Sequence, residues 1–162
     1  MPGSVLDSHA LLAFLRGEPD GETTRRLLEK SAERDAPLHM TEVNYAEVQY
    51  IVRRKDGDAL WQHIARELPA LPITFHPVTR ELADVAADFK ARFSISVADA
   101  FAAALAKTRN TDLVTGDPEF EMLKGEINIH WLDKTSPNLP PVVRESDVTY
   151  RIRRKRKTGK RT

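Results

Sequence analysis

Four acidic residues lie where their carboxylates could act together: Asp7, Glu47, Asp99 and Asp117. Asp7 closes a short apolar run, and Asp117 follows another. Asp99 lies in the first turn of an expected helix, whereas Glu47 shares a helical face with apolar residues, so its carboxylate is predicted to point inward. Acids that converge in this way repel one another unless cations lie between them, as hard divalent ions with oxygen ligands do.

Each of these acids also has a purely structural interpretation. Asp7 is a favoured residue type for capping the helix that follows it, and Asp117, which precedes a proline, fits the start of another helix. Asp99 lies three residues after Ser96, a spacing that resembles a capping box. Glu47 could extend along the helix to reach solvent. These interpretations explain each acid alone, but they do not explain why all four are expected at one edge of a sheet.

The composition narrows the chemistry that such acids could perform. The 162 residues include no cysteine, which excludes thiolate zinc sites, iron–sulfur clusters and cysteine nucleophiles. No phosphate-binding loop of the GxxxxGK type is present. The histidines show no metal-ligand spacing: His9, His39, His63, His76 and His130. The acids therefore best suit metal-assisted phosphodiester hydrolysis, in which Mg²⁺ or Mn²⁺ activates a water molecule and orients the phosphate.

Strands and helices alternate along most of the chain. Strands are expected at 4–7, 37–40, 73–75, 112–115 and 127–132, and helices at 9–16, 22–34, 42–54, 58–68, 78–93, 96–108 and from Pro118. This alternation predicts an α/β fold, specifically a three-layer α/β/α sandwich with a mostly parallel central sheet. In such sheets ligands bind outside the carboxyl ends of the strands, where Asp7 and Asp117 are expected.

Charge divides the chain into a body and a tail. Lys and Arg number 25 against 24 Asp and Glu, but residues 151–162 contain eight of the basic residues and no acid. Residues 1–150 therefore have 17 basic and 24 acidic residues, a formal charge of −7. We predict one domain at 1–134, then a proline-containing linker and a basic tail at 135–162. The start lacks a basic n-region and no segment is long and apolar enough for a membrane span, which favours the cytoplasm.

The sequence resembles the PIN-domain ribonucleases, and most closely the VapC-type toxins of toxin–antitoxin pairs. The matching segments, in the order and separation of the family, are VLDSHALLAFL at 5–15, TEVNYAEV at 41–48, SVADAFAAALA at 96–106 and LVTGDPEF at 113–120. The resemblance covers about residues 4–132, and LVTGDPEF after an Asp-Ala helix is its most specific part. It implies a PIN-like fold, a metal-binding quartet, and hydrogen-bonding support from two further residues: Asp7, Glu47, Asp99 and Asp117, with Ser8 and Thr115.

The resemblance also implies an activity and its partners. The expected activity is endonucleolytic cleavage of RNA by metal-activated water, with Mg²⁺ or Mn²⁺ as the cofactor. Asp7 and Asp99 would be the main ligands, Asp117 would complete the site, and Glu47 would hold a second ion or the attacking water. A cognate small antitoxin protein would cover the acidic site, and the toxin would be a homodimer.

The basic tail adds a candidate site for RNA. Its basic side chains could contact phosphates without sequence preference. The alternative is a solvated, disordered end of the chain. The candidate RNA-binding residues are Arg153, Arg154, Lys155, Arg156 and Lys157.

Other functions remain as alternatives. A receiver-like switch domain also has acids at strand ends, but the expected strand at 73–75 leads into HPVT without the aspartate that such a domain needs. A haloacid-dehalogenase-type phosphatase needs Asp-x-Asp after the first strand, where this chain reads Asp7-Ser8-His9. A PIN-fold nuclease of RNA maturation or of structured DNA would have the same acids, so the residues alone do not separate it from a toxin.

Overall fold

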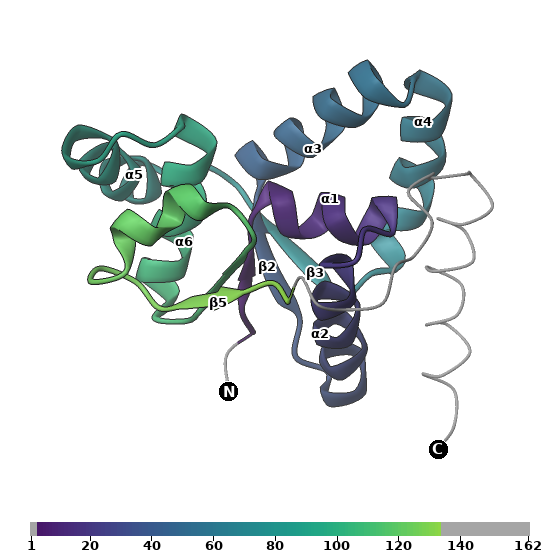
Figure 1. Ribbon diagram of the computed structural model, residues 1–162, viewed down its shortest axis with the longest axis horizontal. Coiled ribbons are helices and arrows are strands. Elements are labelled where there is room, and N and C mark those ends of the chain that lie inside the picture. The colour runs from purple at the N-terminus through teal and green to yellow at the C-terminus, as the bar shows by residue number, and fades with distance from the viewer. Residues whose placement is uncertain (1–2, 134–162) are drawn as a thin grey trace.

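A sheet of five parallel strands forms the centre of the molecule (Figure 1). The computed structural model describes residues 3–133, so the predicted linker and tail at 135–162 lie outside the described residues. The strand order is β3-β2-β1-β4-β5, which places the first strand of the chain between β2 and β4. The strands are β1 (Val5–Leu6), β2 (Leu38–Thr41), β3 (Ile73–His76), β4 (Leu113–Thr115) and β5 (Ile129–Trp131).

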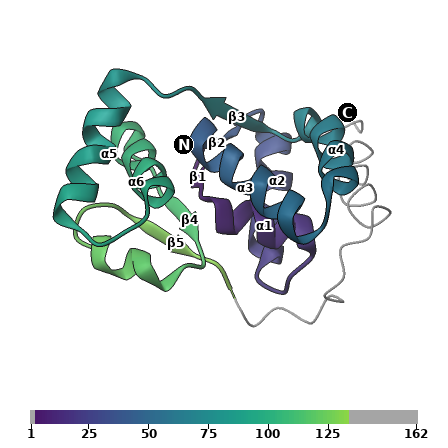
Figure 2. The same ribbon diagram turned by 90° about the horizontal axis from the view of Figure 1, so that it is seen from above.

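Helices cover both faces of the sheet, as Figures 1 and 2 show. One face carries α1 (Ser8–Arg16), α2 (Gly21–Arg34), α3 (Glu42–Lys55) and α4 (Asp58–Glu67), and the other carries α5 (Arg80–Arg92) and α6 (Val97–Arg109). Two 3-10 helices, η1 (Leu68–Ala70) and η2 (Pro118–Leu123), complete the set. The predicted α/β/α sandwich is confirmed, with every strand pair parallel. Within residues 3–133, no helix is long and apolar enough to cross a membrane.

The two central strands direct alternate residues to opposite faces of the sheet. In β1, Leu6 packs with the helices α1 to α4, whereas Val5 packs with α5 and α6. In β4, Val114 packs with α1 to α4 and Leu113 packs with α5 and α6. All four side chains are fully buried. Burial on both faces explains why these strands read as uninterrupted apolar runs rather than as alternating ones.

The alanine-rich helix α6 packs tightly, as its composition predicts. Small side chains let a helix approach its neighbours closely, and this packing holds the amino end of α6, where Asp99 lies, against the sheet. Its buried alanines, each at most 1% exposed, are Ala100, Ala102, Ala103, Ala104 and Ala106.

Hydroxyl side chains mark the start of three helices. Thr41, Thr79 and Ser96 precede α3, α5 and α6, and each hydroxyl accepts a hydrogen bond from the backbone amide three residues later. Such caps satisfy amides that have no partner within the helix. At the start of α3, for example, the Asn44 amide donates to the Thr41 hydroxyl at 3.0 Å.

Three predicted elements differ from the structure. The helix expected over 58–68 ends at Glu67, because Pro69 lacks the amide hydrogen that would continue it and lies in the 3-10 turn η1. The strand expected over 127–132 is reduced to the three residues of β5 at one edge of the sheet. The helix expected from Pro118 is the 3-10 helix η2 rather than an α-helix.

Candidate active site

A cleft of about 320 Å³ lies at the carboxyl ends of β1 and β4 and contains all four acids singled out in the sequence. Asp7 directly follows β1, and Asp117 lies two residues after β4. Glu47 projects from α3 and Asp99 from the first turn of α6. The described residues that line the cleft include no Lys or Arg: Asp7, Ser8, His9, Leu12, Glu47, Ile51, Ser96, Asp99, Asp117 and Glu119.

Asp7 is the most deeply buried of these acids, with 1% of its surface exposed. It caps α1, because its Oδ1 accepts a hydrogen bond from the Ala10 amide at 2.7 Å. Its Oδ2 accepts a hydrogen bond from the Thr115 hydroxyl. Burial raises the pKa of Asp7 to about 7, although the hydrogen bonds from Thr115 and Ala10 oppose that rise. The capping interpretation is therefore correct, and the same carboxylate also faces the cleft.

Thr115 connects the ends of the two central strands. Besides donating to Asp7, its hydroxyl accepts a hydrogen bond from the Asp117 amide at 3.0 Å. One fully buried hydroxyl thus fixes the backbone at Asp117 relative to the carboxylate of Asp7. This geometry agrees with the supporting position that the resemblance gives to Thr115.

Ser8 supports the site through Asn44 rather than through an acid. The Ser8 hydroxyl donates to the Asn44 carbonyl oxygen at 3.3 Å and accepts from Asn44 Nδ2 at 3.1 Å. The same Nδ2 donates to the Ala98 carbonyl oxygen at 3.2 Å, so one buried amide links α1, α3 and the first turn of α6. Sequence reasoning missed Asn44, although it lies one turn before Glu47 on the same helix.

Asp99, Asp117 and Glu119 form a cluster in the cleft, in which one carboxylate oxygen from each lies within 4.8 Å of the others. Burial raises the pKa of Asp99 to about 6, and repulsion from Asp117, Glu47 and Glu119 adds to that rise. Both structural interpretations hold here too. Ser96 Oγ accepts from the Asp99 amide at 3.1 Å, and Asp117 Oδ1 accepts from the Glu119 amide at 2.9 Å.

Glu119 is an acid that sequence reasoning missed. It lies two residues beyond Asp117 in the segment LVTGDPEF, so its position in that segment was the available signal. Asp7 and Asp99, which are expected as the main ligands, line the same cleft, and Asp99 also groups with Asp117 and Glu119. Glu47 is half-buried at the cleft wall, with the Tyr50 hydroxyl 3.5 Å from its Oε1.

Three arginines on the helices around the sheet pair with acids that do not line the cleft. Arg16 pairs with Asp56 at 2.9 Å, and Arg53 pairs with Asp58 at 2.7 Å. Arg92 pairs with residues of α5 and of the turn before β5. In the part of the chain that the structure describes, these arginines are thus paired with acids other than those of the cleft. The oxygen donors of the cleft acids fit a hard divalent cation such as Mg²⁺ or Mn²⁺.

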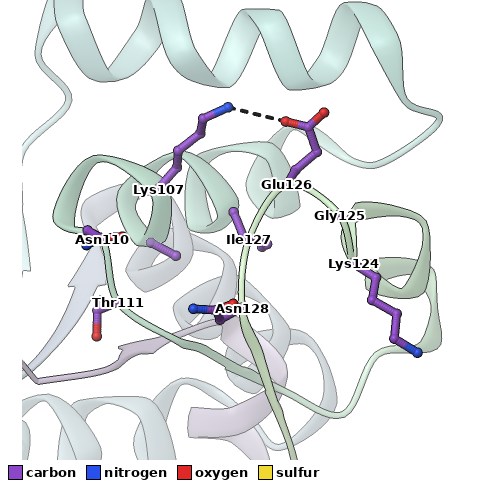
Figure 3. A pocket seen from close by; sticks show the side chains of 9 residues that line it. Lys107, Asn110, Thr111, Lys124, Gly125, Glu126, Ile127 and Asn128 are labelled. Carbon is purple, nitrogen blue, oxygen red and sulfur yellow. Dashed lines mark hydrogen bonds and ion pairs between the residues drawn. The ribbon is translucent and has the colours of Figure 1, made fainter.

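A second hollow, of about 210 Å³, lies at the other end of α6 (Figure 3). Lys107 at its wall pairs with Glu126 at 3.2 Å, and Lys124 pairs with Glu121 at 2.9 Å. Lys107 is eight residues beyond Asp99 on α6, about 12 Å along the helix axis. Both lysines of this hollow are thus paired with carboxylates.

Comparison with known families identifies the fold from the sequence itself. The family model described as the PIN domain matches residues 4–126, which is most of the chain. The chain belongs to the PIN-domain family. This membership assigns the PIN domain described here to a family of nucleases, which are hydrolases that act on nucleic acids. The resemblance expected from the four sequence segments is therefore confirmed.

Solved structures of two VapBC proteins and of FitAcB share the fold of this PIN domain. VapBC2 from Rickettsia felis, solved with a promoter DNA fragment, has a TM-score of 0.66 and 17% identity over 80% of this chain and 98% of its own. DNA-bound VapBC from Salmonella typhimurium has a TM-score of 0.64 and 15% identity over 82% and 100% of the chains. FitAcB from Neisseria gonorrhoeae has a TM-score of 0.60 and 20% identity over 78% and 95%. No curated protein matches the sequence.

Proposed function

We propose that this PIN domain is a divalent-metal-dependent endoribonuclease and the toxin of a type II toxin–antitoxin pair. The observation that supports the proposal most directly is the meeting of five carboxylates in one cleft at the carboxyl edge of the sheet. Burial and mutual repulsion raise the pKa of Asp99, so a bound cation would relieve an electrostatic cost that the fold otherwise carries. The family match supports nuclease activity but gives the receiver-like alternative no support.

The acids would hold Mg²⁺ or Mn²⁺, with Asp7, Glu47, Asp99 and Asp117 as the expected ligands and Glu119 added by the geometry. When bound, such a cation supplies a Lewis acid that activates water and stabilises charge on the leaving oxygen. Thr115 holds Asp7 and the backbone of Asp117 in register. Asn44 fixes the helices that carry Glu47 and Asp99. These contacts preorganise the carboxylates before substrate arrives.

The partners of the PIN domain follow from its relatives. Because the similar structures are toxin–antitoxin complexes, we propose a small cognate antitoxin that covers the acidic cleft. A homodimer and a place in the cytoplasm are further parts of the proposal. The residues proposed to add phosphate contacts with RNA lie outside the described part of the chain. They are Arg153, Arg154, Lys155, Arg156 and Lys157.

Cleavage of total RNA by the purified full chain tests the function. We expect cutting with Mg²⁺ or Mn²⁺, no cutting with EDTA, and at least a hundredfold loss in Asp99→Asn. Asp88→Asn is the matched control, because Asp88 lies on α5 and pairs with Arg92 away from the cleft. Equal activity of Asp99→Asn and the wild type would contradict the proposal. Cleavage of structured DNA in preference to RNA would favour the maturation or DNA-nuclease alternative.

A further inference from the structure

Within residues 3–133, His9 is the only side chain with a basic nitrogen among those that line the acidic cleft. It lies in the first turn of α1, two residues after Asp7. Its side chain is 40% exposed, so the imidazole can reach a molecule bound in the cleft. The roles described above for the acids, Thr115 and Asn44 leave this imidazole unused.

Asp20 holds the imidazole of His9 on one side. His9 Nε2 lies 3.0 Å from Asp20 Oδ2, and the Asp20 side chain is only 13% exposed. Asp20 occupies the N-cap position of α2, where an aspartate ordinarily accepts hydrogen bonds from the helix amides. Its side chain makes no such capping bond, unlike those of Asp7 and Asp117. The Asp20 carboxylate is thus directed to His9 instead of to its own helix.

Two glycines make room for this pair. A Cβ atom at Gly116 would lie 2.6 Å from His9 Nε2, so the imidazole packs directly against the turn between Thr115 and Asp117. A Cβ atom at Gly21 would lie 2.2 Å from the Ala13 carbonyl oxygen. Close approach of α2 to α1 at Gly21 places the neighbouring Asp20 within reach of His9. The position of the His9 imidazole is therefore set by packing against Gly116 and by the hydrogen bond with the Asp20 carboxylate.

The contact with Asp20 decides which nitrogen of His9 remains available. A carboxylate only accepts hydrogen bonds, so His9 Nε2 carries the proton that joins the pair. In the neutral ring Nδ1 is then an acceptor, and it lies on the edge of the ring away from the Nε2–Cδ2 edge that faces Gly116. Phosphate oxygens are also acceptors, so they cannot donate a hydrogen bond to Nδ1. The ribose 2′-hydroxyl is a donor that RNA has and DNA lacks.

We propose that His9, oriented by Asp20, accepts a hydrogen bond from a ribose 2′-hydroxyl of the bound strand, and that this contact makes the cleft select RNA over DNA. The inference rests on the proposed nuclease function and names the feature of the substrate that the cleft recognises. His9 is then a residue that contacts the substrate, and Asp20 is a positioning residue.

Binding of paired oligonucleotides to the full chain tests the proposal. The probes are two short, fluorescein-labelled single strands of the same mixed sequence, one of RNA and one of DNA. The DNA strand contains uracil in place of thymine, so the two probes differ only at the 2′ position of the sugar. Ca²⁺ replaces Mg²⁺ to limit cutting during the anisotropy measurement. We expect the wild type to bind the ribose probe about fivefold more tightly, the worth of one hydrogen bond. His9→Ala should remove that preference by weakening the ribose probe alone.

Further variants separate positioning from folding. Asp20→Asn keeps an acceptor for Nε2 and should retain the preference, whereas Asp20→Ala should lose most of it. His63→Ala on α4 is the matched histidine control and should bind both probes as the wild type does. Mn²⁺ affinity, measured by calorimetry, should be unchanged in His9→Ala and Asp20→Asn. Unchanged Mn²⁺ binding would show that the variants fold and keep the acidic site.

Three results would overturn the proposal. If His9→Ala bound both probes more weakly by the same factor, His9 would contact a phosphate or a base. If His9→Ala kept the preference for the ribose probe, His9 would not contact the 2′-hydroxyl. In both cases wild-type cleavage of RNA would leave the proposed function intact. If the wild type neither binds nor cuts RNA with any metal, the proposed function fails and the inference about His9 fails with it.

Discussion

At the scale of single residues, the carboxylate of Asp7 both caps helix α1 and lines the acidic cleft. It accepts hydrogen bonds from the Ala10 amide and the Thr115 hydroxyl while it is almost fully removed from water. Burial raises its pKa from the ordinary 3.8 to about 7. Between these two values the folded protein binds more protons than the unfolded chain, so the free energy of unfolding falls as pH rises. Above pH 7 the metal-free protein carries the full cost of this buried charge.

Replacing Asp7 by Asn should therefore stabilise the metal-free protein at high pH. We expect Asp7→Asn to melt about 5 °C above the wild type at pH 8, because the amide has no charge to bury. The difference should shrink at pH 5, where the wild-type carboxyl is protonated. Thermal unfolding in EDTA at both pH values measures it. A difference that did not change with pH would contradict the assigned cause, and the variant should also have lost RNA cleavage.

Glu119 should matter for metal binding although only the geometry singles it out. Its carboxylate lies within 4.8 Å of those of Asp99 and Asp117, so loss of its charge removes attraction for a cation. We expect Glu119→Gln to weaken Mn²⁺ binding about tenfold, as measured by calorimetry. Glu121→Gln is the control, because Glu121 lies on the same 3-10 helix but pairs with Lys124. Equal affinities in the two variants would show that Glu119 is not a ligand.

At the scale of elements, the contact between α1 and α2 depends on a glycine. A Cβ atom at Gly21 would meet the backbone of Ala13 at 2.2 Å, and backbone cannot move aside as a flexible side chain can. We expect Gly21→Ala to lower the free energy of unfolding by about 2 kcal/mol or more, measured in urea. Gly125→Ala should be near neutral, because nothing lies within 4 Å of a Cβ atom there. Equal stability of the two variants would contradict the proposed crowding.

The sequence predicts the elements well because their signals are local. Apolar runs, helical spacing and capping residues such as Thr41 lie within one segment, and so the strands, helices and their alternation could be inferred. For the same reason Asp7 and Asp117 could be placed at strand ends, Asp99 at a helix start and Glu47 on the inward face of a helix. The grouping of Asp99 with Glu119 could not be inferred, because it depends on how η2 leaves β4.

Contacts between distant segments explain what sequence reasoning missed. Asn44 holds three helices together, yet an asparagine one turn into a helix has no distinctive pattern. Asp20 looks like an ordinary cap of α2, and only the fold shows its carboxylate on His9. The strand order, with β1 at the centre, also arises from long-range pairing that local propensity does not encode.

At the scale of the whole molecule, a cation in the cleft would join α1, α6 and η2 through their acids. A ligand that binds only the folded state stabilises it, by about 2.7 kcal/mol at one hundred times its dissociation constant. We expect saturating Mn²⁺ to raise the melting temperature by several degrees at pH 8. Asp99→Asn should lose most of this rise and Asp88→Asn should keep it. A rise of equal size in both variants would place the ion elsewhere.

The central position of β1 in the sheet affects when the acidic cleft can form during translation. Thr115, whose hydroxyl donates to the Asp7 carboxylate, follows Asp7 by 108 residues. Until then β1 lacks its neighbour β4, and the carboxylates of Asp117 and Glu119 do not yet exist. The acidic cleft therefore forms only after translation has passed Glu119. A metal ion cannot meet the full set of cleft carboxylates before that point.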